Sequence, residues 1–87
     1  MAFRVTEIQP TPNPNATKFV LDRPIADVPT SFLSQDQAQG HPIAQRLFAI
    51  PGVSSLLLLG DFVTVNKAAD VNWAPIKRKV RQVLAEL

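Results

Sequence analysis

Apolar and polar residues alternate along four short segments of the chain, which is the pattern of half-buried β-strands. The four segments are Ala2–Ile8, Lys18–Asp22, Val53–Leu59 and Phe62–Lys67. In the fourth segment, Val63 and Val65 point to one face of the predicted sheet. Phe62 and Thr64 then point to the other face. The pair Gly60-Asp61 between the last two segments predicts a tight hairpin, because glycine in first place favours a type II′ turn.

Apolar residues recur at helical spacing after Pro42. Ile43, Leu47 and Ile50 lie on one side of a helix over residues 43–50. Proline suits the first turn of a helix, where its missing N–H would have had no partner in any case. Pro51-Gly52 is expected to end the helix.

The last helix is predicted to begin after Asp70 or Asn72, either of which can cap its first turn, and to run to the C-terminus. One face of this helix carries its large apolar residues, which are Trp73, Ile76, Val80, Val83, Leu84 and Leu87. Because Trp73 belongs to this stripe, we expect it in the core, where its indole N–H needs a hydrogen-bond partner.

The segment over residues 23–40 shows neither periodicity. Pro24 and Pro29 interrupt it, so it is predicted to be a loop with one short turn of helix over Gln35–Ala38, which Ser34 can cap. The elements then follow in the order strand, strand, helix, strand, strand, helix. This order predicts an α+β domain of ββαββα type, with a small antiparallel sheet and two helices packed on one face.

A chain of 87 residues forms one domain, so residues 1–87 are taken as a single unit. Its free energy of unfolding should be modest, on the order of 5 kcal/mol. The longest apolar run, Leu56–Leu59, is far shorter than the roughly 20 residues of a membrane span, and it could form a central or an edge strand. No secretory signal is evident. The sequence has no cysteine and so no disulfide that would point to an oxidising compartment. A cytoplasmic location is therefore predicted.

The residues that carry out catalysis or hold metals are scarce in this chain. There is no cysteine, and His41 is the only histidine, whereas protein zinc sites need three or four ligands. A catalytic triad would have only His41 as its base, and no glycine-rich elbow surrounds a serine. Phosphate-binding and dinucleotide-binding motifs are also missing. The sequence therefore predicts no enzyme activity, no cofactor and no metal site.

Four of the nine basic residues lie within five positions near the C-terminus, at Lys77, Arg78, Lys79 and Arg81. The net charge of +2 would be −2 without them. One interpretation is a solvated helix face. The other is a nucleic-acid-binding face formed by Lys77, Arg78 and Arg81, although basic residues alone support only non-specific attraction to phosphates.

A proline-rich segment, Thr11–Asn15, separates the first two predicted strands. Its prolines fix φ and remove backbone donors, so it should be rigid and extended. One interpretation is a preorganised binding loop, in which the prolines reduce the entropy lost on binding and the asparagines offer polar groups. The alternative is a stiff connector that covers the edge of the sheet.

The face of the predicted sheet opposite the helices is a second candidate for recognition. Phe62 and Thr64 would lie there beside four residues of the first two strands, namely Arg4, Thr6, Lys18 and Val20. An exposed aromatic ring next to cations suits contact with a protein. In the alternative arrangement Phe62 packs beneath the hairpin.

Four sequence blocks resemble the N-terminal domain of Nfu/NifU-type iron–sulfur scaffold proteins. They are Thr11-Pro12-Asn13-Pro14 followed by Lys18-Phe19, then Leu47-Phe48-Ala49-Ile50-Pro51-Gly52-Val53, then Asp61-Phe62-Val63-Thr64-Val65 with Lys67, and finally Asp70 with Trp73. Each block alone is weak evidence, but the four occur in the order typical of the family. The resemblance implies a role in iron–sulfur cluster biogenesis.

In that family a separate C-terminal domain with a Cys-x-x-Cys pair carries the cluster. Thiolates are the ligands that hold iron–sulfur clusters, and this sequence has none. The resemblance therefore implies a stand-alone N-terminal domain, a non-catalytic module that contacts a scaffold, carrier or target protein of iron–sulfur biogenesis. The expected partner-binding residues are Thr11, Pro12, Asn13, Pro14, Asn15, Lys18, Asp61, Phe62 and Thr64. A small nucleic-acid-binding protein remains the alternative.

Overall fold

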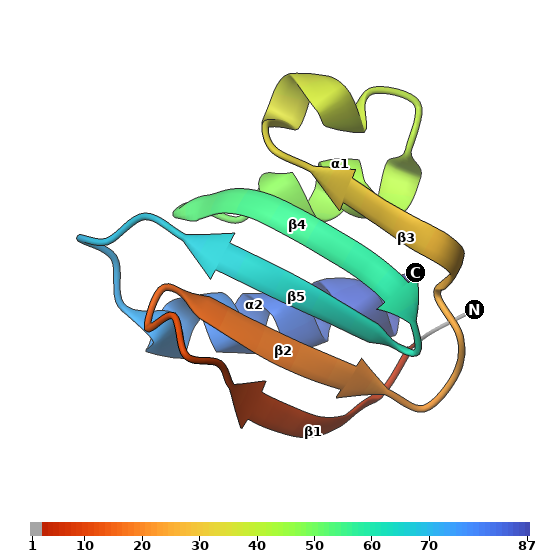
Figure 1. The fold of residues 1–87 in the computed structure, drawn as a ribbon, viewed down its shortest axis with the longest axis horizontal. Helices are drawn as coiled ribbons and strands as arrows, with labels where there is room; N and C mark the ends of the chain where they lie inside the picture. Colours follow the sequence, from red (N-terminus) through yellow and green to blue (C-terminus); the bar gives the residue numbers. More distant parts are fainter. Residues whose placement is uncertain (1–2) are drawn as a thin grey trace.

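The computed structural model describes residues 3–87 and contains five strands, one 3₁₀ turn and two helices (Figure 1). In chain order the elements are β1 (Val5–Pro10), β2 (Ala16–Leu21), β3 (Ala26–Phe32), η1 (Gln35–Ala38), α1 (Pro42–Phe48), β4 (Val53–Gly60), β5 (Phe62–Lys67) and α2 (Trp73–Glu86). The first predicted strand began at Ala2, which lies outside the described residues.

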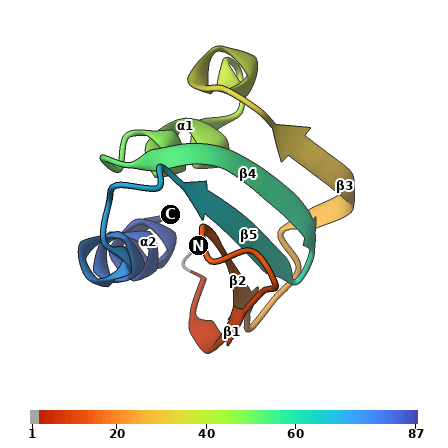
Figure 2. The same cartoon turned by 60° about the vertical axis from the view of Figure 1, so that its left-hand side comes forward.

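All five strands belong to one antiparallel sheet in the order β1-β2-β5-β4-β3. Both helices lie on the same face of this sheet, and no element of residues 3–87 covers the opposite face (Figures 1 and 2). The predicted α+β class, with an antiparallel sheet and two helices on one face, is confirmed. The predicted number of strands, four, was too small.

The additional strand is β3, which lies in the segment predicted to be a loop. Pro29 sits inside this strand, and a register shift separates Ala26 from Thr30 where β3 pairs with β4. Proline cannot donate to a strand partner, so it is tolerated only at sheet edges and bulges. Because β3 is the outermost strand on its side of the sheet, Pro29 costs no essential hydrogen bond.

The four-leucine run forms the middle of β4, which lies between β5 and β3. It is therefore an interior strand, which settles the choice between central and edge positions. Leu56 and Leu58 are buried against the helices, whereas Leu57 and Leu59 are half-buried on the opposite face. The β4–β5 turn contains Gly60 with a φ of +55°, as the predicted type II′ hairpin requires at its first turn position.

The core lies between the sheet and the two helices. From α2 the buried residues are Ile76, Val80 and Leu84, and from α1 they are Ala44, Leu47 and Phe48. They pack on the buried residues of the strands, among them Phe19, Leu58, Val63 and Val65. Helix α1 ends at Phe48, two residues earlier than predicted. The chain then turns through Gly52, whose φ is +97°.

Helix α1 is capped by a residue that the sequence analysis left without a role. His41 occupies the N-cap position, and its Nδ1 accepts a hydrogen bond of 3.2 Å from the backbone N–H of Ala44. The imidazole also makes an edge contact with the ring of Phe32, with 5.1 Å between ring centroids. Ser34, predicted as a cap, makes no side-chain cap bond to the 3₁₀ turn.

Replacing His41 with alanine should lower the free energy of unfolding by about 1 kcal/mol, because the cap of α1 is lost. His41→Asn should recover much of that loss, since asparagine is a good N-cap residue. Urea denaturation of the three proteins checks this expectation. Equal stabilities of the alanine and asparagine variants would show that the ring contact with Phe32, and not the cap, is what His41 contributes.

Candidate interaction surfaces

The Thr11–Asn15 segment, hereafter the proline loop, is held in shape by its own polar groups. The hydroxyl of Thr11 lies 2.9 Å from the carbonyl oxygens of both Asn13 and Ala16, and it accepts a 3.2 Å hydrogen bond from the N–H of Asn13. The side-chain oxygen of Asn13 accepts from the N–H of Asn15 at 2.9 Å. The asparagine oxygen is thus used inside the loop, and such local bonds are typical of asparagine in turns.

The proline loop is also tied to the start of α2 and the end of β5. The indole Nε1–H of Trp73 donates to the carbonyl oxygen of Pro14 at 2.9 Å. Lys67 donates from its ammonium to Asn15 Oδ1 at 3.1 Å, and its Nζ lies 5.7 Å from the centroid of the Trp73 ring. Trp73 is half-buried and packs against the core without being one of its fully buried residues, so its prediction as a core residue is confirmed only in part. Its indole N–H has the expected hydrogen-bond partner, and this bond anchors the proline loop.

The sheet face opposite the helices, hereafter the open face, carries a central cluster of six side chains. They are Lys18, Val20, Leu57, Leu59, Phe62 and Thr64, all half-buried. The strand register places Phe62 between Val20 and Leu59, and Thr64 between Lys18 and Leu57. The ammonium of Lys18 lies 4.2 Å from the centroid of the Phe62 ring, a cation–π geometry.

Leu57 and Leu59 were missed as members of the open face. The alternation of β4 contains the signal, but four identical leucines do not reveal which two point to the helices. Their pairing with β5 decides it, because Leu58 lies opposite the buried Val63 and Leu57 lies opposite Thr64. Phe62 lies on this face and not beneath the hairpin.

Arg4 does not lie on the open face. Thr6 lies against β2, where its hydroxyl donates a hydrogen bond of 3.3 Å to the carbonyl of Val20. A register shift between Val5 and Glu7 interrupts the alternation of β1, as an extra residue in a strand does. Arg4 instead lines a cavity together with Arg81 of α2.

The nine expected partner-binding residues thus fall into three places. The proline loop lies at the start of β2, and Asp61 lies at the opposite end of the sheet, where its carbonyl accepts from the N–H of Leu21 at 2.7 Å. Lys18, Phe62 and Thr64 lie on the open face between these two ends. The nine residues therefore do not line one common cavity.

The four basic residues of α2 do not all lie on one side of the helix. Lys77 lines a cavity beside the proline loop, Lys79 lines a different cavity between α1 and α2, and Arg81 lines a third beside Arg4. Arg78 is exposed and lines none of these three. A helix turns about 100° per residue, so consecutive cations point in different directions. Lys77, Arg78 and Arg81 span an arc of about 100° on the helix, and Lys79 lies outside that arc. The nucleic-acid-binding face formed by these three residues stays a prediction.

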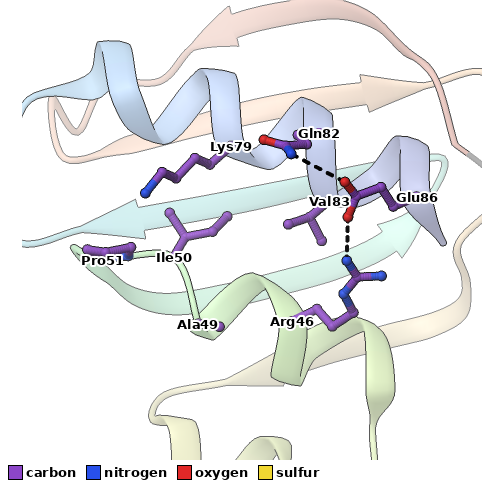
Figure 3. A pocket seen from close by; sticks show the side chains of 8 residues that line it. All are labelled: Arg46, Ala49, Ile50, Pro51, Lys79, Gln82, Val83 and Glu86. Carbon is purple, nitrogen blue, oxygen red and sulfur yellow. Dashed lines mark hydrogen bonds and ion pairs between the residues drawn. The ribbon is translucent and has the colours of Figure 1, made fainter.

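The cavity between α1 and α2 has a volume of about 290 Å³ and an apolar floor that includes Ile50 and Val83 (Figure 3). An ion pair between Arg46 and Glu86, with 2.6 Å between nitrogen and oxygen, spans the two helices at its rim. Both side chains are exposed, and exposed ion pairs contribute little to stability. The cavity holds no cluster of groups suited to catalysis.

Within residues 3–87, no group of three or more histidine, cysteine or acidic side chains lies close enough together to hold a metal ion. No helix of this part of the chain is both long and apolar enough to cross a membrane.

Comparison with known proteins identifies relatives along nearly the whole chain. The sequence profile described as "Scaffold protein Nfu/NifU N terminal" matches residues 5–87. A NifU-like protein of Schizosaccharomyces pombe is 40% identical over 82 residues, which cover 87% of this chain and 30% of that protein. The human NFU1 iron-sulfur cluster scaffold homolog, mitochondrial, is 37% identical over 77 residues, covering 86% of this chain and 30% of the human protein.

Solved structures agree with the sequence comparisons. The solution structure of a NifU-like protein from Saccharomyces cerevisiae has a TM-score of 0.80 and 30% identity, and the match covers 92% of this chain and 74% of that one. The crystal structure of a Staphylococcus aureus protein has a TM-score of 0.77 and 28% identity, covering 92% of this chain and 96% of that one. The chain spans less than a third of the length of the curated relatives named above. Since the family profile matches almost every residue, this chain belongs to the family of Nfu/NifU N-terminal domains.

Proposed function

We propose that this chain is a single, non-catalytic interaction module that assists iron–sulfur cluster assembly or delivery by binding another protein of that process. The family and the names of its relatives support a role related to iron–sulfur assembly. The module would dock on a scaffold, a carrier or a cluster-bearing target. It would not hold the cluster by itself, because its sequence contains no cysteine thiolate.

The observation that carries this proposal is the open face. Neither helix covers this face of the sheet (Figure 2). The strand register brings four apolar residues together at its centre, namely Val20, Leu57, Leu59 and Phe62. Isolated apolar residues at a surface are ordinary, whereas a contiguous apolar patch with a polar rim is typical of a protein contact. Lys18, Thr64 and the neighbouring Asn66 and Ser55 supply the polar rim.

The proline loop supports the same proposal from one end of the open face. Pro12 and Pro14 are exposed, while the hydrogen bonds of Thr11, Asn13 and Trp73 hold the backbone in a single shape. A loop ordered before binding loses little entropy when a partner docks. The expected partner-binding residues remain those of the loop together with Lys18, Asp61, Phe62 and Thr64.

The test is a comparison of affinity captures with an open-face variant. Wild type should enrich proteins of cluster assembly or proteins that bear clusters, and the double variant Leu57→Ser with Phe62→Ser should reduce that enrichment at least about tenfold. Aromatic residues in the centre of an interface often contribute 2 kcal/mol or more, roughly a factor of 30. Quantitative mass spectrometry of the captured proteins measures the change.

The matched control is Val28→Ser, which removes an apolar side chain that is 64% exposed on the outer strand β3. It should leave the captured proteins unchanged. If wild type and both variants capture the same proteins, the open face does not bind them. If none of the proteins that depend on the open face acts in iron–sulfur biogenesis, the assigned process is wrong.

The absence of catalysis and the cytoplasmic location are parts of this proposal that need their own measurements. The human relative named above is a mitochondrial protein, so cell fractionation of the source organism has to decide the location. Purified protein should be colourless and free of stoichiometric iron. A sample that binds iron tightly without a partner would contradict the proposed role.

A further inference from the structure

Two cavities lie along the groove between the edge strand β1 and helix α2. The first, of about 330 Å³, includes Ile8 and Pro10 from the strand and Trp73 and Lys77 from the helix. The second, of about 500 Å³, is lined by Phe3, Arg4, Val5, Asp22, Arg23, Arg81 and Ala85. Strand and helix run in opposite directions, because the later residues of β1 accompany the earlier residues of α2. The two cavities have no lining residue in common, and the N–H of Phe3, which lines the second, donates to the carbonyl of Leu84 in α2 at 2.8 Å. We call the two cavities together the β1–α2 groove.

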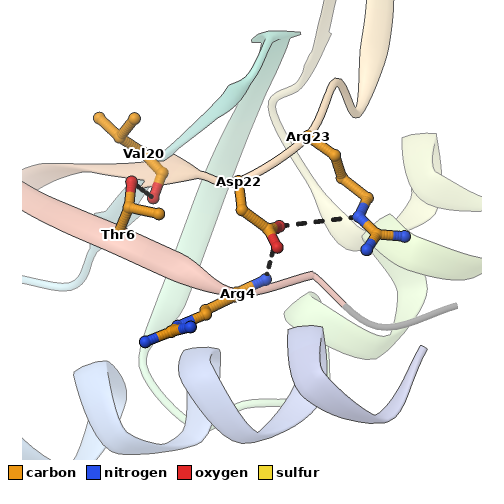
Figure 4. A network of polar contacts seen from close by, with 5 residues as sticks. All are labelled: Arg4, Thr6, Val20, Asp22 and Arg23. Carbon is orange, nitrogen blue, oxygen red and sulfur yellow. Dashed lines mark hydrogen bonds and ion pairs between the residues drawn. The ribbon is translucent and has the colours of Figure 1, made fainter.

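The groove is strongly cationic. Lys77 and Arg81 line it from the helix, Arg4 from the segment before β1, and Arg23 from the end of β2. The one carboxylate among the lining residues is Asp22, which is already engaged, as it accepts from the N–H of Arg4 at 3.0 Å and lies 3.7 Å from Nε of Arg23 (Figure 4).

The other cations of the groove are available to a ligand. Within residues 3–87 the side-chain nitrogens of Arg4, Lys77 and Arg81 make no hydrogen bond or ion pair. Figure 4 shows the guanidinium of Arg4 turned away from Asp22, towards α2. Uncompensated cations of this kind attract carboxylates or phosphates.

The backbone of β1 offers a second kind of contact. As the outermost strand, β1 pairs only with β2, so its outward-facing N–H and C=O groups have no strand partner. Such an edge can accept an added strand from another chain. The register shift at Val5/Glu7 and the missing N–H of Pro10 limit this pairing to a short stretch around Ile8.

The spacing of the cations fits an extended chain. Lys77 and Arg81 are four residues apart on α2, which corresponds to a rise of about 6 Å along the helix. Alternate residues of a β-strand are about 6.6 Å apart and point to the same side. Acidic residues at positions i and i+2 of an added strand would therefore face Lys77 and Arg81 in turn.

We propose that the β1–α2 groove binds an extended acidic segment of a partner protein, which adds to the outer edge of β1 and places alternate carboxylates against Lys77 and Arg81. The apolar residues of the two cavities, Ile8 and Pro10 in one and Phe3 and Val5 in the other, would receive side chains between the acidic ones. A peptide is favoured over a nucleic acid because the groove combines an unpaired strand edge with apolar walls. Thr11, Asn13 and Pro14 of the proline loop also line the first cavity, so the groove adjoins the loop. The proposal does not depend on the open face or on iron–sulfur assembly.

The experiment uses a peptide of about ten residues, enough for one strand, in which glutamate and valine alternate. Titration into isotopically labelled protein should shift the NMR signals of β1 and α2 and leave those of the open face in place. The double variant Lys77→Glu with Arg81→Glu should weaken binding at least about tenfold, because two attractive pairs become repulsive. Binding should also weaken as salt is added.

The matched control changes the same total charge on the same helix. Arg78→Glu with Lys79→Glu alters two cations that lie outside the groove and should change the affinity by no more than about twofold, through the long-range field alone. A peptide with N-methyl groups on alternate backbone nitrogens should bind weakly, since methylation removes the donors that pair with β1. Because Arg81 is exposed, Arg81→Gln serves as a milder variant if the double variant unfolds.

Several results would overturn the proposal. The first is that the acidic peptide does not bind to the wild type, and the second is that the groove and control variants lose the same amount of affinity for it. The third is that the N-methylated peptide binds as tightly as the unmethylated one. The fourth is that the NMR signal shifts are confined to the open face. A single-stranded oligonucleotide that binds through Lys77 and Arg81 when the peptide does not would assign the groove to nucleic acid. Failure of this proposal leaves the capture experiment on Leu57 and Phe62 unaffected, so the two ideas can be judged separately.

Discussion

Leu58→Ala should remove about half or more of the free energy of unfolding, whereas Leu57→Ala should leave most of it. The two leucines are neighbours in β4, but Leu58 is fully buried among the core residues and Leu57 is half-buried on the open face. Removing a buried leucine side chain costs about 2–5 kcal/mol, because apolar burial is lost and a cavity remains. A total stability on the order of 5 kcal/mol for a domain of this size leaves little after that loss.

The same truncation at Leu57 should cost only about 1 kcal/mol, a typical value for a change near the surface. Urea unfolding followed by circular dichroism compares the two variants. Each of them replaces one leucine with alanine, so the same atoms are removed in both. Similar losses at both positions would mean that both faces of β4 are buried, and the open face would then be covered by something in solution, such as a second copy. The Leu57 variant should also bind partners more weakly than wild type, since it removes part of the proposed docking surface.

Gly52→Ala should be the most damaging of the glycine substitutions. Gly52 has a φ of +97°, a conformation that alanine adopts only at a cost of about 1–2 kcal/mol. A Cβ at this position would lie 2.8 Å from Cγ1 of Val71 and 3.3 Å from Cδ1 of Ile76. Because Ile76 belongs to the buried face of α2, the clash would push the start of that helix away from the sheet, which should cost about 1–3 kcal/mol more.

Gly60→Ala is the control that measures the conformational cost of alanine at a positive φ. Gly60 also has a positive φ, +55°, but a Cβ there meets nothing within 4 Å. Its substitution should therefore carry the conformational cost alone, and the difference between the two variants should be about 1–3 kcal/mol in the free energy of unfolding. If Gly60→Ala destabilises as much as Gly52→Ala, the contact with Val71 and Ile76 is unimportant and the φ angles dominate both effects.

The periodicity of the sequence was enough to place most of the elements. Alternation located β2, β4 and β5, and helical spacing located α1 and α2, because each of these elements buries one face and exposes another. The four sequence blocks likewise indicated the family that the comparisons confirmed. Signals of this kind are local, so they need no knowledge of which strands are neighbours.

The candidate surfaces were only partly foreseeable. The proline loop and the pair Phe62 and Thr64 could be singled out from residue types and alternation. The anchoring of that loop by Trp73 could not, because the hydrogen bond to Pro14 joins residues 59 positions apart. Trp73 fits an apolar stripe equally well in the core or at its margin, and only the packing of the loop distinguishes the two.

The sequence by itself determined the class of fold, the period of each strong element and the lack of thiolate ligands. Tertiary structure alone decided that residues 26–32 form a strand despite Pro29 and which leucines of β4 face outward. It also decided that Lys77 and Arg81 face the β1 side of α2 whereas Lys79 faces α1. The physical reason is that a strand at the edge of a sheet, a register and a groove are each defined by contacts between distant residues. The interaction energies of these contacts exist only in the folded chain, so they cannot be predicted from a local sequence pattern.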